Sequence, residues 1–210
     1  MRRLAQAFFS PDEQKRILEA VRAAEAQTAA EIVPMVVGAS DSYPKAELAC
    51  ALTVGLVAGV VLSLLGGTRG MWLFLVYFGL FTLAGFQAAK RLPALKRPFV
   101  SPERARHETL QAAQAAFYVH GLAETRERNA LLVYISVFER LVFLLPDSGL
   151  ARKLDRSVLD AAAAALSDGI RQGRQAEALA ETVARLAAAL APLYPPRDNE
   201  ANELKDLILL

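Results

Sequence analysis

Two uncharged stretches, LACALTVGLVAGVVLSLL (48–65) and MWLFLVYFGLFTLAGFQAA (71–89), decide the fold of this chain of 210 residues. They contain 18 and 19 residues. A helix of that length, at about 1.5 Å per residue, approaches the ~30 Å thickness of the hydrocarbon core of a bilayer. Only GGTRG (66–70) lies between them. We therefore predict a transmembrane helical hairpin over 46–97, with both flanks on one side of the membrane.

Other interpretations of these stretches fit less well. Helices buried in a soluble core usually keep some polar positions, and these runs have no charged ones. A signal peptide is disfavoured because the first 47 residues are amphipathic and charged. The spans contain no Asp, Glu, Lys or His of the kind that forms ion sites or proton relays, so they indicate an anchor rather than a transporter. Gly55 and Gly59 form a GxxxG pattern, which favours packing of the hairpin on itself, with a dimer motif as the alternative.

The charges that flank the hairpin predict its orientation. Lys45 precedes it, Arg69 lies in its loop, and four basic residues follow it (Lys90, Arg91, Lys96 and Arg97). Basic residues are retained on the cytoplasmic side, so the soluble parts and both termini are expected in the cytoplasm. Most of the basic excess, five basic residues to one acidic over 46–97, adjoins the apolar block although the net charge is only +2. This distribution argues against a nucleic-acid partner and for the lipid bilayer.

The segment before the hairpin predicts one helix and one strand. Ser10, Pro11 and Glu13 form a capping box with proline at the first helical position, which predicts a helix over 11–29. EIVPMVV (31–37) is typical of a strand, with its proline either at a sheet edge or at a bulge.

The segment after the hairpin predicts the rest of a sheet and its covering helices. A helix begins at Ser101-Pro102-Glu103 and ends near His120-Gly121. ALLVYISV (130–137) is apolar on both faces, as in a central strand, and RLVFLL (140–145) follows after a tight turn. Asp155 is expected to cap a helix that Gly173 ends. The last helix, around 179–190, stops before Pro192.

Neither flank can bury its apolar faces alone. Residues 1–45 and 98–196 are therefore predicted to form one α/β domain that the hairpin interrupts, with strand 31–37 in the same sheet as strand 130–137. The tail, 197–210, alternates acidic and apolar residues and is expected to be extended.

The sequence carries few signs of catalytic chemistry. It has no Walker loop, GxGxxG, GxSxG or HExxH pattern, and its single cysteine, Cys50, excludes an intrachain disulfide. His107 and His120 are expected to be structural. Asp147, Asp155 and Asp160 lie near predicted strand ends, where carboxylates can bind calcium or another divalent cation. Asp147 and Asp155 are the candidate metal ligands, although Asp155 is more simply a helix cap and Asp160 a solvated residue.

Three segments resemble the TPM-domain (TPM phosphatase) family in that family's order: EAQTAAEIVPMVV (25–37), TRERNALLVYISVFERLVFLLPDSGL (125–150) and GIRQGRQAEALAETV (169–183). The tail DNEANELKDL (198–207) is similar to that of its bacterial membrane branch. The resemblance implies a three-layer α/β/α sandwich around a small sheet, in a bacterial inner or plasma membrane. In this chain Met1–Phe9 replaces the opening strand and Asp-containing turn of the family, and only Asp155 matches an acidic family position.

The family's activities vary. A plant relative is linked to phosphatase activity and photosystem repair, other members bind calcium, and an animal member is an auxiliary subunit of a receptor. Because this chain lacks a catalytic constellation, we expect a non-enzymatic, membrane-anchored module for interaction, assembly or repair, with other membrane proteins or a second copy as partners. The alternative is a divalent-cation-dependent phosphatase or other hydrolase that uses Asp147 and Asp155.

Overall fold

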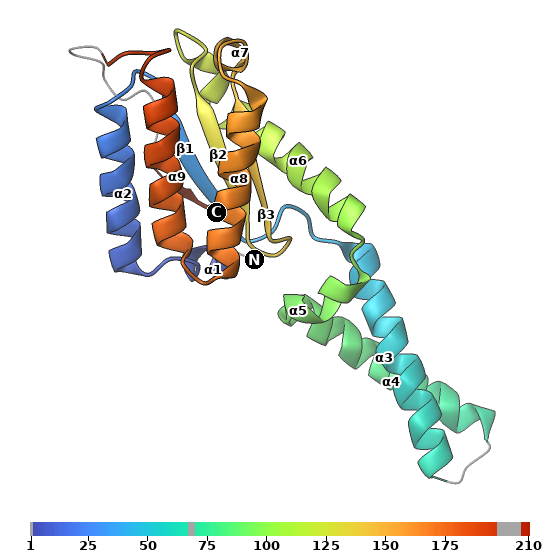
Figure 1. Ribbon diagram of the computed structural model, residues 1–210. Coiled ribbons are helices and arrows are strands. Elements are labelled where there is room, and N and C mark those ends of the chain that lie inside the picture. Colours follow the sequence, from blue (N-terminus) through green and yellow to red (C-terminus); the bar gives the residue numbers. More distant parts are fainter. Residues whose placement is uncertain (1, 67–69, 197–206) are drawn as a thin grey trace. The chain divides into compact units, whose positions relative to one another are not determined.

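The computed structural model describes residues 2–66, 70–196 and 207–210. It divides into two compact units (Figure 1). The α/β unit comprises Met1–Ser40 and Arg106–Leu210, and the helical unit comprises Asp41–Ala105. The helical unit includes more residues than the predicted hairpin, 46–97, because it also contains residues on either side of that range. Arg69 and most of the tail lie outside the described residues.

The α/β unit contains a mixed sheet in the order β3-β2-β1-β4. The strands are β1 (Ile32–Val37), β2 (Leu131–Ser136), β3 (Leu141–Pro146) and β4 (Ile208–Leu209). β1 pairs with β2 in parallel, and β2 pairs with β3 antiparallel. These pairings confirm that strands far apart in the sequence share one sheet and that 140–145 returns as a hairpin. β4 joins the free side of β1, a pairing that the sequence did not predict.

Pro34 lies within β1 without a bulge, because the register with β2 is continuous from Ile32 to Val37. The Glu31 carbonyl accepts a hydrogen bond from the first residue of β2 and the Val37 carbonyl accepts one from the residue after that strand, whereas the Val36 carbonyl accepts one from Leu210. Alternate residues of a strand direct their backbone groups to opposite sides, so the proline nitrogen faces away from β2. The missing N–H therefore leaves the β1–β2 ladder intact.

The helices of the α/β unit follow their capping signals. They are α1 (Arg2–Gln6), α2 (Pro11–Glu25), α6 (Pro102–Val119, which begins in the helical unit), α7 (Ser148–Ala151), α8 (Arg156–Arg171) and α9 (Gln175–Leu190), with a 3₁₀ turn, η2, at Leu122–Glu124. The capping box at Ser10 and Glu13 is present. Gly121 and Gly173 follow α6 and α8 with positive φ, as predicted. The short helices α1 and α7 were not predicted.

The predicted helix 11–29 ends four residues early, at Glu25. The residues that follow it hydrogen-bond to the segment after α9 instead of continuing the helix. Thr28 Oγ1 donates to the Tyr194 carbonyl at 2.7 Å, and the Ala29 N–H donates to the same oxygen at 3.0 Å. A long-range partner therefore replaces the last helical turn.

Apolar clusters cover the sheet on both faces. One contains Ile32, Val36 and Leu131 with side chains from α2, α8 and α9. The other contains Leu132 and Tyr134 with side chains of α6 and the segment after it. Figure 1 shows α2, α8 and α9 together beside the sheet. β2 is thus buried on both sides, as its continuous apolar sequence predicted.

The helical unit is a hairpin of α3 (Pro44–Leu65) and α4 (Met71–Arg91), followed by α5 (Pro93–Lys96) and a 3₁₀ turn, η1 (Arg97–Phe99). Both long helices are long and apolar enough to cross a membrane. In the most apolar 18 residues of each helix, only 22% (α3) and 6% (α4) are buried, whereas the core helix of a soluble protein is mostly buried. A Cβ atom on Gly55 would lie 2.8 Å from the Phe78 carbonyl oxygen of α4, so this glycine serves packing within the hairpin.

Candidate functional site

The two predicted metal ligands lie at helix starts. Asp147 is the N-cap of α7 and its Oδ1 accepts the Ser148 N–H at 2.5 Å. Its carboxylate is buried, and within the described residues Oδ2 has no hydrogen-bond partner. Asp155 is the exposed N-cap of α8, with Oδ1 2.9 Å from the Ser157 nitrogen. That hydrogen bond lowers the pKa of the Asp155 carboxyl. The predicted capping role of Asp155 is confirmed.

The remaining chemistry-bearing residues are dispersed. Asp160 is largely exposed and pairs with Arg156 at 3.9 Å on α8. His107 is exposed on α6, and His120 follows the end of that helix. The buried Cys50 Sγ lies 3.6 Å from the Leu95 carbonyl oxygen. Across 2–66, 70–196 and 207–210, no three His, Cys, Asp or Glu residues come together as a metal-binding group.

A polar network that sequence reasoning missed lies where β1 and β2 end. Ser40 Oγ donates to Ser136 Oγ at 3.0 Å, and Ser136 Oγ donates to Glu139 Oε2. Glu139 Oε1 also accepts the Ser40 N–H at 2.9 Å. The Tyr134 hydroxyl lies 3.5 Å from Ser40 Oγ. This network therefore joins the β2–β3 turn to the residue at which the chain leaves the α/β unit.

The geometry of the network favours a structural role. α/β sheets place ligands at the carboxyl ends of parallel strands, so this is the position where a ligand site is expected. Ser136 is fully buried, however, and a substrate cannot reach its hydroxyl without displacing the network. Burial raises the pKa of the Tyr134 phenol, which keeps that hydroxyl neutral. Both Glu139 oxygens accept hydrogen bonds, so the carboxylate fixes the exit of β1.

No local signal could have identified this network. Ser40 lies 99 residues before Glu139, and both residues follow strands as ordinary loop residues. Only the parallel register of β1 with β2, which pairs Val37 with Ser136, brings them together.

The helical unit contains a buried ion pair at Lys96. Lys96 was predicted to be one of the exposed basic residues that flank the membrane hairpin. Its side chain is instead only 1% exposed, and its Nζ lies 2.8 Å from Glu47 Oε1. Its Nζ also donates to the Ser42 carbonyl at 2.5 Å. The pair joins the start of α3 to the end of α5. The negative charge of Glu47 thus offsets the positive charge of Lys96 within the helical unit, and Lys96 adds less to the positive charge beside the hairpin than predicted.

Together these features define a class of protein: a mixed α/β protein with a long apolar helical hairpin between its first two strands. Neither family models nor curated proteins match the sequence. Among solved structures, the chain is similar to the NMR structure of the BA42 protein from the psychrophilic bacterium Bizionia argentinensis, with a TM-score of 0.60 and 16% identity. The match covers 96% of this chain and 94% of that one. This likeness supports the fold alone.

Proposed function

We propose that the chain is a membrane-anchored, TPM-like protein whose α/β unit is a non-enzymatic module for interaction, assembly or repair of membrane proteins. The observation that carries the proposal is the exposed apolar surface of α3 and α4. Leu56, Leu64 and Trp72 are 52%, 76% and 78% exposed. A bilayer removes such surface from water at a gain of about 25 cal/mol per Å² of apolar area. Burial within a bilayer therefore accounts for these side chains.

The orientation in this proposal places the α/β unit in the cytoplasm. Lys90 and Arg91 end α4, and the Lys90 Nζ lies 4.4 Å from the centre of the Phe86 ring. A basic residue with an aromatic neighbour is typical of a membrane–water interface. The α/β unit carries the apolar clusters on both faces of its sheet that a three-layer α/β/α sandwich requires.

The non-enzymatic assignment rests on how the candidate groups are used. Asp155 caps α8, the Glu139 carboxylate holds the β1 exit, and Ser136 is buried. Asp147 favours the second candidate function, a divalent-cation-dependent phosphatase, because its buried Oδ2 lacks a partner among the described residues. A phosphatase of that kind needs further carboxylates around Asp147 to bind the cation.

Membrane topology is tested first, with the full-length chain in cells. In a Cys50→Ala background, single cysteines replace Gly70 between the long helices and the exposed Ser101 after them. An impermeant maleimide is expected to label only the Gly70 variant, and the protein is expected to resist alkaline extraction from membranes. Labelling of Ser101→Cys from outside, or release by alkali, would contradict the proposal.

Function is tested on detergent-purified protein. We expect reproducible co-purification with a membrane protein or self-association, and no turnover of a generic phosphoester with calcium, magnesium or manganese. Turnover that is lost in Asp147→Asn and kept in Asp160→Asn, an exposed aspartate with the same chemistry, would instead establish the phosphatase.

A further inference from the structure

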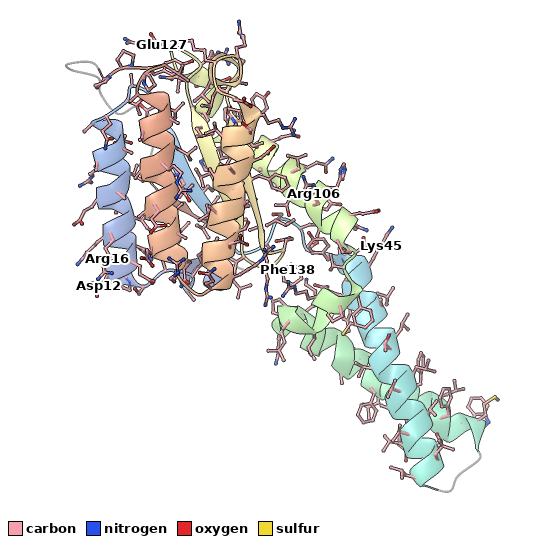
Figure 2. The ribbon with its side chains drawn as sticks, in the orientation of Figure 1. Asp12, Arg16, Lys45, Arg106, Glu127 and Phe138 are labelled. Atoms are coloured by element: carbon pink, nitrogen blue, oxygen red, sulfur yellow. The ribbon has the colours of Figure 1, made fainter. Side chains whose placement is uncertain are left out.

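A pocket of about 510 Å³ lies at the end of the sheet where β2 begins. Three segments form its walls: the loop before β2, the end of α7 and the chain after α9. Its lining residues are Arg126, Glu127, Arg128, Gly149, Arg152, Lys153, Leu193, Tyr194 and Pro195. Figure 2 shows Glu127 at one end of the α/β unit and Phe138, in the β2–β3 turn, at the other. The pocket is therefore at the opposite end of the sheet from Ser40.

The pocket concentrates positive charge in a part of the chain that is otherwise slightly acidic. Residues 98–210 carry 13 basic and 15 acidic side chains, yet four basic residues and one acidic residue line this pocket. Arg128, Arg152 and Lys153 are exposed, and no described carboxylate pairs with them. Within the part of the chain that the structure describes, Arg152 forms one side-chain hydrogen bond, from Nε to the Ser148 carbonyl at 3.1 Å. Its terminal guanidinium nitrogens are therefore available to bind an anion.

Backbone contacts hold the walls of the pocket in place. The Leu150 N–H donates to the Arg128 carbonyl at 3.1 Å, which joins the loop to α7. A Cβ atom on Gly149 would lie 2.6 Å from that same carbonyl oxygen, so the two segments approach at a distance that only glycine allows. Arg128 adopts a left-handed φ of 52°, a conformation that costs a non-glycine residue energy. The arginine is thus held beside the pocket.

The floor of the pocket positions the lysine. Tyr194 is only 3% exposed, and its carbonyl accepts the hydrogen bonds from Thr28 and Ala29. The Lys153 Nζ lies 4.1 Å from the centre of the Tyr194 ring. A fixed ring under the ammonium group limits its motion, which lowers the entropy lost when an anion binds.

We propose that this pocket binds a small multivalent oxyanion, such as the di- or triphosphate group of a soluble compound. Guanidinium groups match the oxygens of phosphate in paired hydrogen bonds, and a cluster with more cations than anions raises the local anion concentration. A phospholipid headgroup offers the same chemistry. We commit to the soluble source, and the lipid arms of the test below distinguish it from the headgroup. The inference concerns binding alone and does not depend on the proposed function.

The test measures binding of inorganic pyrophosphate to the full chain in lipid nanodiscs by calorimetry at low salt. Wild-type protein is compared with Arg152→Gln/Lys153→Gln. A matched control, Lys15→Gln/Arg185→Gln, removes one lysine and one arginine from exposed positions of α2 and α9 outside the pocket. We expect binding about tenfold or more weaker in the pocket variant and unchanged within about twofold in the control.

Each outcome decides the proposal. Absence of pyrophosphate binding, or equal losses in the two variants, would overturn it. Nanodiscs of neutral and of anionic lipid then distinguish the two sources. Equal pyrophosphate affinity in both supports a soluble ligand, whereas competition by anionic lipid that disappears in the pocket variant would overturn the soluble assignment in favour of a headgroup.

Discussion

Replacing Gly55 by alanine tests how the two long helices pack. The new Cβ atom would overlap Thr82 Oγ1 and would lie 2.8 Å from the Phe78 carbonyl oxygen and 3.0 Å from the Thr82 nitrogen. Rotation of the threonine side chain relieves only the first of these contacts. The other two involve the α4 backbone, so α3 and α4 must move apart.

A second glycine supplies the reference for the size of the effect. Gly79 lies on an exposed part of α4, and a Cβ atom there would meet nothing within 4 Å. Either alanine gains about 1 kcal/mol of helix propensity, and this gain cancels between the two variants. Overpacking costs about 1–3 kcal/mol. Gly55→Ala is therefore expected to unfold with a free energy about 1–3 kcal/mol lower than that of Gly79→Ala.

The assay is unfolding of the full chain in detergent, followed by circular dichroism, together with the oligomeric state of each variant. Equal stabilities for the two alanine variants would refute the packing argument. Conversion of an oligomer to a monomer by Gly55→Ala, with no loss of hairpin stability, would show that the GxxxG pattern is a dimer motif instead.

Substitutions of four other side chains are expected to change the stability of the fold, which unfolding measurements can check. Ser10→Ala is expected to cost about 1 kcal/mol of stability. Hydrogen bonds from Ser10 lower the pKa of the Glu13 carboxyl. The ionised carboxylate therefore stabilises the fold above the ordinary carboxyl pKa, and this stabilisation is lost as the pH falls. The difference in unfolding free energy between wild type and Glu13→Gln is expected to narrow in acid. Lys96→Met removes the lysine that forms an ion pair with the Glu47 carboxylate and is expected to cost about 3–5 kcal/mol, which Lys96→Met/Glu47→Leu largely restores in a double-mutant cycle. Asn129→Ala removes a buried donor to a backbone carbonyl and is expected to cost about 1–3 kcal/mol in urea unfolding.

Features of the fold that depend on nearby residues could be predicted from the sequence. The capping box at Ser10 involves residues within one helical turn, and the long apolar helices follow from uninterrupted uncharged runs. The pairing of β1 with β2 was predictable for another reason. A strand that is apolar on both faces cannot be an edge strand exposed to water, so it needs a neighbour and cover from both parts of the chain.

Features that depend on distant partners could not be predicted in the same way. β4 has only two residues, and its place in the sheet depends on the backbone of β1: the Leu210 N–H donates to Val36 and the Gly38 N–H donates to Leu210. The network at Ser40 and the pocket around Arg152 likewise combine segments far apart in sequence. Asp147 directly follows β3 as predicted, whereas α7 separates Asp155 from that strand, and the two carboxylates cap different helices.

The position of the hairpin explains how two long apolar helices and an α/β fold can share one chain. Parallel strands such as β1 and β2 need a crossover connection of a dozen or more residues, usually through a helix. Here α6 supplies that helix, because Ala113 and Phe117 pack into the cluster beside β1 and β2. The hairpin lengthens a connection that the sheet already requires. Each doubling of a flexible connection costs only about 0.6 kcal/mol of closure entropy, and the hydrogen bonds of Ser40 fix the point where the chain leaves. The sheet therefore tolerates the insertion without giving up the contacts that hold it together.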